Sequence, residues 1–226
     1  MALNGIINEM EIENGVLKKY HGNEKEVVIP DGVTEIGDGA FRNCDCIKVI
    51  AIPNSVTSIG EYAFEDCGNL TDVKIPNNLT KIGYCAFSGC CGLDTLVIPN
   101  SVKVIEDFAF QDCGLESIIL SKGLTRIGRG LFYDCGNLTT VVIPDGVTSI
   151  GFKAFYRCYS LRDVILPSSL TSIDDSAFAG CDLRSIVLPD NLIFIGYKAF
   201  GDVRLILNVA NARKDENDTA YLKSNN

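Results

Sequence analysis

Tryptophan is absent from this chain of 226 residues, and histidine occurs once, as His21. Nucleophilic catalysis by serine or cysteine needs a base held beside the nucleophile, and the residues around His21 suggest no such arrangement. No glycine-rich phosphate loop occurs either, because most of the 21 glycines mark recurring bends. These absences argue against an enzyme and leave His21 as a solvated loop residue.

An excess of positive charge is also missing, because the formal net charge is -9. Nucleic acid phosphates and anionic membrane surfaces both attract clustered Lys and Arg. No apolar run approaches the roughly 18 residues of a membrane-spanning helix. The start, MALNGIINEM, lacks the basic region and apolar core of a secretory signal, so the chain either has no leader or has lost one. We expect neither nucleic acid binding nor membrane insertion.

The chain does contain an internal sequence repeat that recurs along its length. Its clearest marker is a phenylalanine that recurs every 22 or 23 residues, at Phe41, Phe64, Phe87, Phe110, Phe132, Phe155, Phe178 and Phe200. All prolines share one position of this repeat, at Pro30, Pro53, Pro76, Pro99, Pro144, Pro167 and Pro189, and Ser121 takes that position once. A cysteine follows three residues after seven of the phenylalanines, at Cys44, Cys67, Cys90, Cys113, Cys135, Cys158 and Cys181. Three markers in phase make chance agreement negligible.

One unit, LTDVKIPNNLTKIGYCAFSGC at 70–90, illustrates the pattern. Val73 inward, Lys74 outward and Ile75 inward is the period-2 alternation of a strand with one buried face. Proline ends such a strand because it has no N–H to donate. A second short extended piece follows, and we expect the segment around Phe87 to return the chain as a single helical or 3₁₀ turn.

A unit this short buries its apolar face only by stacking against its neighbours. The repeat therefore predicts a single right-handed solenoid of about eight coils, mostly strand and coil, with a parallel sheet on one face and a length of roughly 35–40 Å. We expect an N-terminal hairpin cap over 1–25, in which Asn14-Gly15 forms the turn and Ile12, Val16 and Leu17 cover the first coil. The solenoid is expected over 26–207, and a polar segment over 208–226 as the start of a helix or a truncated cap.

The strand-Pro, Ile-Gly and Ala-Phe-x-x-Cys markers resemble the BspA-like, or treponemal-type, leucine-rich repeats, which belong to the α/β-type repeat class. The resemblance covers about residues 24 to 207 and departs at Leu131, Ser121, Glu106 and Asp174. It implies a protein-recognition module, often on bacterial surfaces and sometimes binding host matrix proteins or other bacteria. Localisation at the cell surface or outside the cell rests on this resemblance alone, and the resemblance fixes no ligand.

The repeated cysteines are predicted to be buried, reduced thiols that fill one position of the core. Cys46, Cys85 and Cys91 lie outside this series, but neither Cys44-x-Cys46 nor Cys90-Cys91 has the CxxC spacing of a metal site. We therefore expect no metal and no cofactor. Carboxylates recur beside the cysteines as a solvated edge rather than a catalytic pair, at Asp45, Asp66, Asp112, Asp134 and Asp182.

The outward position at the centre of each predicted strand is apolar in most coils, where a solvated sheet would carry polar residues. From one coil to the next it is Val28, Ala51, Lys74, Val97, Ile119, Val142, Ile165 and Val187. The last five form a β-branched stripe flanked by polar or charged rows, which is the anatomy of an interaction surface. Arg162 and Arg184 stand beside its end, either as candidate anchors of a partner or as solvated residues of the rim. The alternative is that valine and isoleucine merely suit strand centres.

The sequence thus predicts a non-enzymatic module that binds a protein or peptide along the sheet face, centred on Val97, Ile119, Val142, Ile165 and Val187 with Arg162 and Arg184. A homodimer through the same face is an alternative occupant of the stripe. Two other functions stay open. One is a structural spacer, and the other is a glycan binder, which needs aromatics and carboxylates gathered on one face, whereas the eight tyrosines are scattered among caps and turns.

Overall fold

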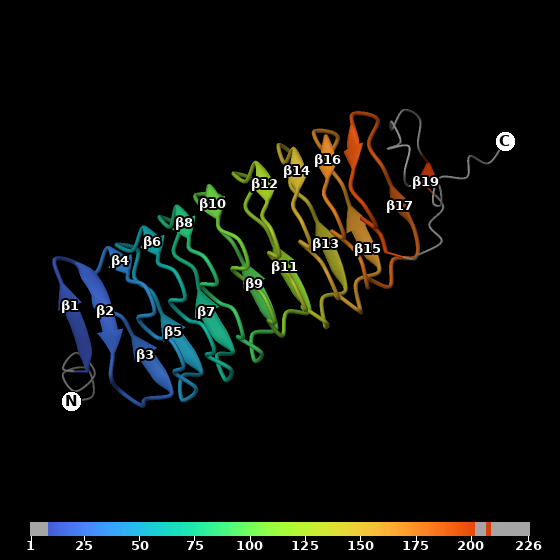
Figure 1. Ribbon diagram of the computed structural model, residues 1–226. Coiled ribbons are helices and arrows are strands. Elements are labelled where there is room, and N and C mark those ends of the chain that lie inside the picture. Colours follow the sequence, from blue (N-terminus) through green and yellow to red (C-terminus); the bar gives the residue numbers. More distant parts are fainter. Residues whose placement is uncertain (1–8, 202–206, 209–226) are drawn as a thin grey trace.

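The computed structural model describes residues 9–201 and the strand β19, Leu207–Asn208. The chain winds through stacked coils whose strands lie in two parallel rows (Figure 1). No helix occurs in these two described ranges. The predicted solenoid of about eight coils is confirmed, but parallel strands line two of its sides rather than one.

The first strand row pairs strands one coil apart, for example Val97 opposite Ile119 and Val142 opposite Ile165. Its strands are β3 (Glu26–Val28), β5 (Val49–Ala51), β7 (Asp72–Lys74), β9 (Thr95–Val97), β11 (Ser117–Ile119), β13 (Thr140–Val142), β15 (Asp163–Ile165), β17 (Ile186–Val187) and β19 (Leu207–Asn208). The second strand row lies across the turn that follows each proline. Its strands are β2 (Val16–Tyr20), β4 (Glu35–Ile36), β6 (Ser58–Ile59), β8 (Lys81–Ile82), β10 (Val104–Ile105), β12 (Arg126–Ile127), β14 (Ser149–Ile150), β16 (Ser172–Ile173) and β18 (Phe194–Ile195).

Strand and proline alternate as the sequence predicts. In β7 the side chain of Val73 is buried between exposed Asp72 and Lys74, and Ile75 is buried beyond the strand. One coil later, the Ile98 N–H donates to the Ile119 carbonyl (2.8 Å), and the next residue, Pro99, has no N–H to continue the ladder. The Pro99 carbonyl then accepts the Val102 N–H at 3.0 Å, which closes the turn towards the second strand row.

The expected single helical or 3₁₀ turn around each core phenylalanine is present only as isolated turns with hydrogen bonds to the third residue before, and they do not continue into a helix. Around Phe87, the N–H groups of Ala86 and Ser88 donate within their own coil, to Gly83 and Cys85, whereas the Phe87 N–H donates to Ala109 of the next coil at 2.8 Å. Cys85 and Gly89 have left-handed backbones, with φ of 50° and 74°. A left-handed residue on each side of the phenylalanine interrupts helical geometry and turns alternate N–H groups towards the neighbouring coil.

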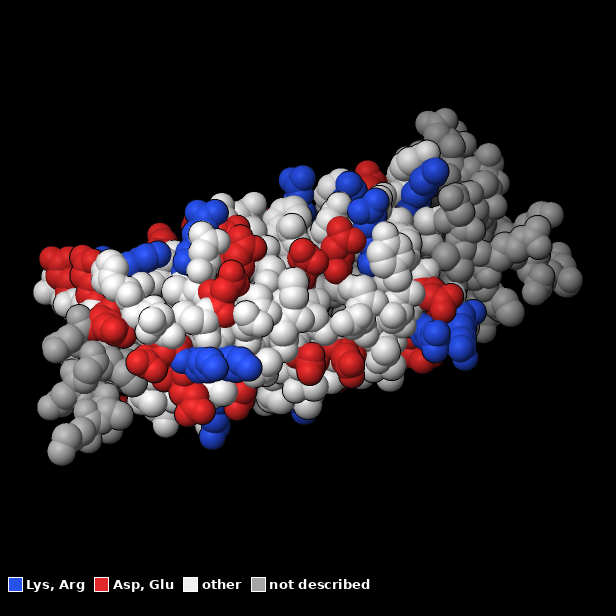
Figure 2. All heavy atoms as spheres, turned by 90° about the horizontal axis from the view of Figure 1, so that it is seen from below, with Lys and Arg blue, Asp and Glu red and all other residues white. Residues whose placement is uncertain are grey.

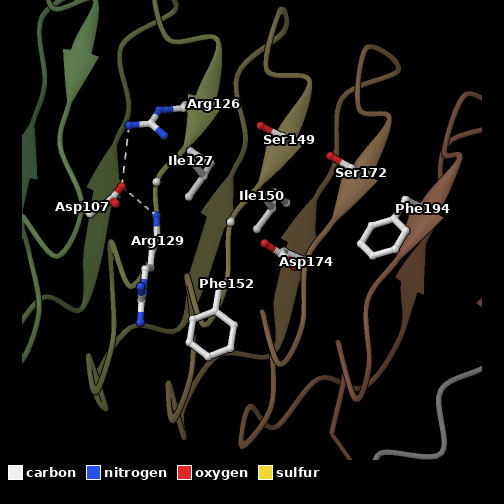
Figure 3. A pocket seen from close by; sticks show the side chains of 12 residues that line it. Asp107, Arg126, Ile127, Arg129, Ser149, Ile150, Phe152, Ser172, Asp174 and Phe194 are labelled. Atoms are coloured by element: carbon white, nitrogen blue, oxygen red, sulfur yellow. Dashed lines mark hydrogen bonds and ion pairs between the residues drawn. The ribbon is translucent and has the colours of Figure 1, made fainter. Parts of the chain in front are cut away.

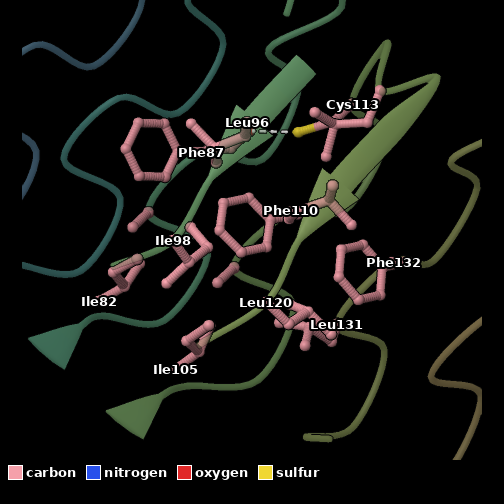
Figure 4. Packing of buried hydrophobic residues seen from close by; sticks show 14 of the residues in the cluster. Ile82, Phe87, Leu96, Ile98, Ile105, Phe110, Cys113, Leu120, Leu131 and Phe132 are labelled. Atoms are coloured by element: carbon pink, nitrogen blue, oxygen red, sulfur yellow. Dashed lines mark hydrogen bonds between the residues drawn. The ribbon is translucent and has the colours of Figure 1, made fainter. Parts of the chain in front are cut away.

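The core contains a column of stacked phenylalanine rings from Phe41 to Phe200. Figure 4 shows part of it, with Phe87, Phe110 and Phe132. The rings of Phe87 and Phe110 are 5.7 Å apart at an angle of 17°, and those of Phe155 and Phe178 are 5.0 Å apart at 2°. Such pairs contribute about 0.5–1.5 kcal/mol each beyond the area that they bury. Each coil therefore stabilises the next through ring contacts as well as hydrogen bonds.

A hairpin of β1 (Met10–Glu13) and β2 precedes the first coil, with Asn14 (φ 50°) and Gly15 (φ 78°) in its turn. Both turn residues have positive φ, as a type I′ turn requires. Leu17 is fully buried and pairs with Ile36 of the first coil, but Ile12, which was expected to help cover that coil, is exposed. Met10 and Tyr20 of the same hairpin are buried instead, and the pairing of β1 with β2 shifts register between Glu11 and Ile12. The helix or cap predicted over 208–226 lies outside the described residues, apart from Asn208 at the end of β19.

Candidate interaction surface

The apolar stripe predicted from the sequence is exposed along the first strand row. Its members are Val97, Ile119, Val142, Ile165 and Val187, with 59, 64, 57, 62 and 75% of their surface accessible. The residues on either side of each member point into the core, so the strand alternation fixes the outward direction. Val28, Ala51 and Lys74 continue the same row towards the N-terminus and are also exposed. Five consecutive coils thus present β-branched side chains to solvent.

Charged and polar residues flank the stripe at the start of each strand. Asp94 and Glu116 lie near Val97 and Ile119, and Arg162 and Arg184 lie near Ile165 and Val187. All four are exposed, and the Arg184 N–H donates to the Arg162 carbonyl at 3.4 Å, so the two arginines occupy adjacent coils as predicted. The Arg162 guanidinium contacts Asp182 at 3.2 Å. An exposed ion pair of this kind contributes little to stability.

A shallow hollow of about 440 Å³ opens beside the stripe where Val97 and Ile119 meet the proline turns. Asn77, Asn100 and Lys122 form its polar border, and the Asn100 side-chain oxygen accepts the Lys122 N–H at 3.0 Å. This hollow could not be predicted from the sequence, since it depends on the depth of the turns between the two strand rows.

The repeat profile described as the BspA type leucine rich repeat region matches residues 10–96 and 80–206 in six copies. The chain belongs to this family. No curated protein matches the sequence. Proteins with BspA-type repeats are typically binding modules without enzymatic activity, so the family supports a protein-interaction scaffold in general terms.

Several solved structures share both the repeat and the fold. A leucine-rich repeat protein of Bacteroides ovatus is 33% identical over 80% of this chain and 48% of its own, with a TM-score of 0.75. A leucine rich cell surface protein of Faecalibacterium prausnitzii is 32% identical over 86% of this chain and 50% of its own, with a TM-score of 0.60. The T. pallidum leucine-rich repeat protein is 31% identical over 80% of this chain and 73% of its own, with a TM-score of 0.54. The chain spans about half the length of the first two proteins.

The repeated cysteines of this BspA-type chain act as hydrogen-bond donors in the core. Six of them donate the thiol to the phenylalanine carbonyl of the preceding coil, as Cys135 does to Phe110 at 2.9 Å and Cys158 to Phe132 at 3.1 Å. Burial raises the pKa of the Cys67 and Cys135 thiols to about 12 and keeps these groups protonated. All ten cysteines are free, and Cys91 is exposed. A thiol that donates to a buried carbonyl is a structural group rather than a nucleophile.

Two other kinds of functional feature are absent from the described ranges. Among the residues described, no group of three or more His, Cys, Asp or Glu is arranged to hold a metal ion. No helix in the same part of the chain is long and apolar enough to cross a membrane.

The tyrosines lie in the turns, as expected, but the repeat aligns several of them in a way the sequence analysis missed. Tyr62, Tyr84, Phe108, Tyr133 and Tyr156 form one row in which neighbouring ring centroids are 5.2 to 6.5 Å apart. Arg42, Arg129, Lys153 and Arg157 lie over these rings. The sequence repeat could have revealed this row, because each member lies two or three residues before, or one residue after, a core phenylalanine.

Charge is distributed unevenly along the solenoid. Figure 2 shows one long side on which acidic and basic side chains gather in two lengthwise groups, with mostly uncharged surface between them. Partial burial, followed by the nearby carboxylates of Asp134 and Asp66, raises the pKa of Asp112. The sequence repeat thus places carboxylates in equivalent positions of different coils, where they repel one another.

Proposed function

We propose that this chain is a non-enzymatic recognition module that binds a protein or peptide along the apolar stripe of the first strand row. The observation that carries the proposal is the exposure of five in-line β-branched residues, from 57 to 75%. Strand propensity alone explains valine or isoleucine at one such position, but threonine serves a solvated strand as well and avoids the exposed apolar surface. Burial of the stripe by a partner explains why valine or isoleucine occupies this position in all five coils.

The backbone beneath the stripe is rigid before any partner arrives. Strand hydrogen bonds join β9, β11, β13 and β15, and the stacked phenylalanine column ties all five coils of the stripe, including that of β17. A preformed surface loses little conformational entropy on binding, so a modest apolar area is sufficient for specific association. At about 4.8 Å per coil, the five residues extend over roughly 19 Å, which suits an extended segment or a flat protein face.

The flanking charges indicate the partner's polarity. Asp94 and Glu116 flank one end of the stripe, and Arg162 and Arg184 flank the other. We expect the bound surface to be apolar along its centre, basic opposite Asp94 and acidic opposite Arg184, because complementary charge fixes orientation and increases the association rate. A second copy of the chain satisfies this pattern if it binds antiparallel, so a homodimer is the alternative occupant.

The wider role that we propose is adhesion or recognition at a bacterial surface. This part of the proposal is supported by the resemblance to a protein described as a leucine rich cell surface protein, with which the chain shares 32% identity. The competing role is a spacer that holds other domains apart. In that case the stripe has no partner and tolerates charge.

The test compares wild-type protein with a Val142→Glu, Ile165→Glu double variant against matrix proteins, bacterial surface extracts and glycans. Val104→Glu, an exposed apolar residue of the second strand row, is the matched control. Circular dichroism establishes that each variant is folded, and light scattering reports any dimer. We expect the double variant to lose at least tenfold in affinity and the control to bind normally. Equal binding by all three proteins would place recognition on another surface, and no binding by any would favour the spacer.

A further inference from the structure

A second hollow, of about 540 Å³, lies on the second strand row (Figure 3). The stripe lies on the first strand row, along a different side of the solenoid (Figure 1). Its floor is formed by residues with short side chains or none. Ser149 and Ser172 lie in β14 and β16, and Gly128 and Gly151 directly follow β12 and β14. Arg126 and Asp107 stand at one end and Phe194 at the other, with Arg129 and Phe152 along one side (Figure 3). A volume of this size is typical of small-ligand sites.

The strand register orders the groups that face this hollow. Arg126 pairs with Ser149, Ser149 with Ser172, and Ser172 with Phe194, so a cation, two hydroxyls and an aromatic ring follow one another across four strands. Ser149 and Ser172 are half-buried and line the hollow, so their hydroxyls are accessible to a ligand. Phe194 is 48% exposed although it is a large apolar side chain. A ligand can form hydrogen bonds with the two hydroxyls and pack against the aromatic ring.

The glycine floor is fixed by backbone packing and keeps the hollow open. A Cβ atom on Gly151 would lie 2.9 Å from the Arg129 nitrogen and 3.0 Å from the Gly128 carbonyl carbon, so alanine does not fit there without a shift. At the same repeat position two coils after Gly128 the chain carries Asp174, whose side chain borders the hollow. One carboxylate oxygen of Asp174 accepts the Asp175 N–H at 2.8 Å. The departure from glycine therefore places a hydrogen-bond acceptor at the border of the hollow, in the same coil as Ser172.

The charges around the hollow cancel. The Asp107 carboxylate contacts the Arg126 guanidinium at 3.7 Å and accepts the Arg129 N–H at 3.0 Å. The Arg129 guanidinium lies over the rings of Phe108 and Phe152, 5.7 and 5.0 Å from their centroids, which holds it in place. Two arginines and two aspartates give the lining a formal net charge of zero, so electrostatics favour neither an anion nor a cation.

We propose that this hollow is a binding site for a neutral saccharide. A sugar ring presents an apolar C–H face for Phe194 and many hydroxyls for Asp174, Arg126, Ser149 and Ser172. A purely apolar ligand would bury these polar groups without partners, at a cost of about 1–3 kcal/mol each. An acidic ligand would meet the unpaired Asp174 carboxylate. The site is independent of the stripe, so a chain that binds protein on the first strand row can bind a glycan on the second.

The experiment uses saturation-transfer NMR and calorimetry on the whole chain, with cellotetraose, maltotetraose, mannotetraose and chitotetraose as neutral probes and tetragalacturonate as an acidic probe. We expect at least one neutral probe to bind with a Kd of about 1 mM or tighter. Phe194→Ala and Asp174→Asn should each weaken that binding about tenfold or more. Both positions are on the surface, so neither change should unfold the protein. The Val142→Glu, Ile165→Glu variant should bind the saccharide as wild type does, which separates this site from the stripe.

Three results would overturn the proposal. The first is no binding of any neutral probe at 10 mM, and the second is binding that survives both Phe194→Ala and Asp174→Asn. The third is preference for tetragalacturonate with loss on Arg129→Gln, which assigns the hollow to an anion. If a protein partner of the stripe also loses affinity on Phe194→Ala while no saccharide binds, the hollow belongs to the protein interface.

Discussion

The Sγ atom of Cys113 lies 3.0 Å from the carbonyl oxygen of Phe87, which belongs to the preceding coil. The same carbonyl accepts the backbone N–H of Cys90 in its own coil at 3.2 Å. One carbonyl thus receives two donors, and the thiol joins two coils at a point that the strand rows do not reach. The spacing of Ala-Phe-x-x-Cys encodes this link, because the cysteine must follow the phenylalanine by three residues to lie above the carbonyl of the coil before.

Replacing the Cys113 thiol should weaken the solenoid by an amount that depends on the donor. Cys113→Ala leaves the Phe87 carbonyl with one donor and opens a small cavity, and we expect a loss of about 1–2 kcal/mol, or roughly 3–6 °C in Tm. Cys113→Ser keeps a donor and should lose less. Thermal unfolding followed by circular dichroism measures both. A larger loss for serine than for alanine would contradict the hydrogen-bond role.

Thiol reactivity should divide the cysteines by position. With pKa values raised to about 12, the Cys67 and Cys135 thiols are ionised to about one part in ten thousand at pH 8, and both are buried. Exposed Cys91 should therefore be alkylated first by iodoacetamide, and the buried thiols only when urea unfolds the chain. Mass spectrometry of timed digests gives the order. Early modification of Cys135 in the native protein would show that its coil opens.

Ser121 holds the position that proline takes in the other seven coils, and its environment explains why. Its buried hydroxyl donates to the Val102 carbonyl at 2.6 Å and accepts the Gly123 N–H at 3.0 Å. Ser121→Ala removes both bonds and should cost about 1–3 kcal/mol. Ser121→Pro removes them too, but it restricts the unfolded chain and should recover about 0.4–1 kcal/mol. We expect Tm to fall in the order wild type, proline, alanine, and a proline variant below alanine would refute this balance.

Asp112 should make the protein less stable as pH rises. Its raised pKa means that the folded state binds a proton more tightly than the unfolded state, so stability falls as pH rises through the interval from the unfolded pKa to the folded pKa. Asp112→Asn removes this penalty and suits the left-handed backbone (φ 54°). Because the side chain is exposed, we expect a gain of only about 0.5 kcal/mol at pH 7, and a smaller one at pH 3.5. Asp145→Asn, at an exposed turn, is the control; an Asp112 gain that did not shrink at low pH would argue against repulsion.

The sequence predicts the features that recur in every coil. It does not predict those that depend on backbone geometry or on contacts between residues far apart in the chain. Phe87, Pro76 and Cys90 were assigned correctly, because stacking forces equivalent residues into equivalent positions. The segment around Phe87 was expected to form a single helical or 3₁₀ turn, but sequence period alone does not reveal the left-handed Cys85, which keeps that turn isolated. The hollow near Phe194 was missed because its walls come from residues up to 87 positions apart, between Asp107 and Phe194.

The outward stripe was predictable from alternation alone, and Val142 and Ile165 are exposed as expected. Whether anything binds there is a different matter, because strand propensity and recognition select the same residue types. Only an experiment on the exposed face separates these two causes.

The most direct measurement places a photoreactive benzoylphenylalanine at position 142 in one protein and at position 104 in another, each mixed with the partner that the binding comparison identifies. We expect a covalent adduct from position 142, on the first strand row, and none from position 104, on the second. Adducts from position 104 with none from position 142 would contradict it and place recognition on the other side of the solenoid.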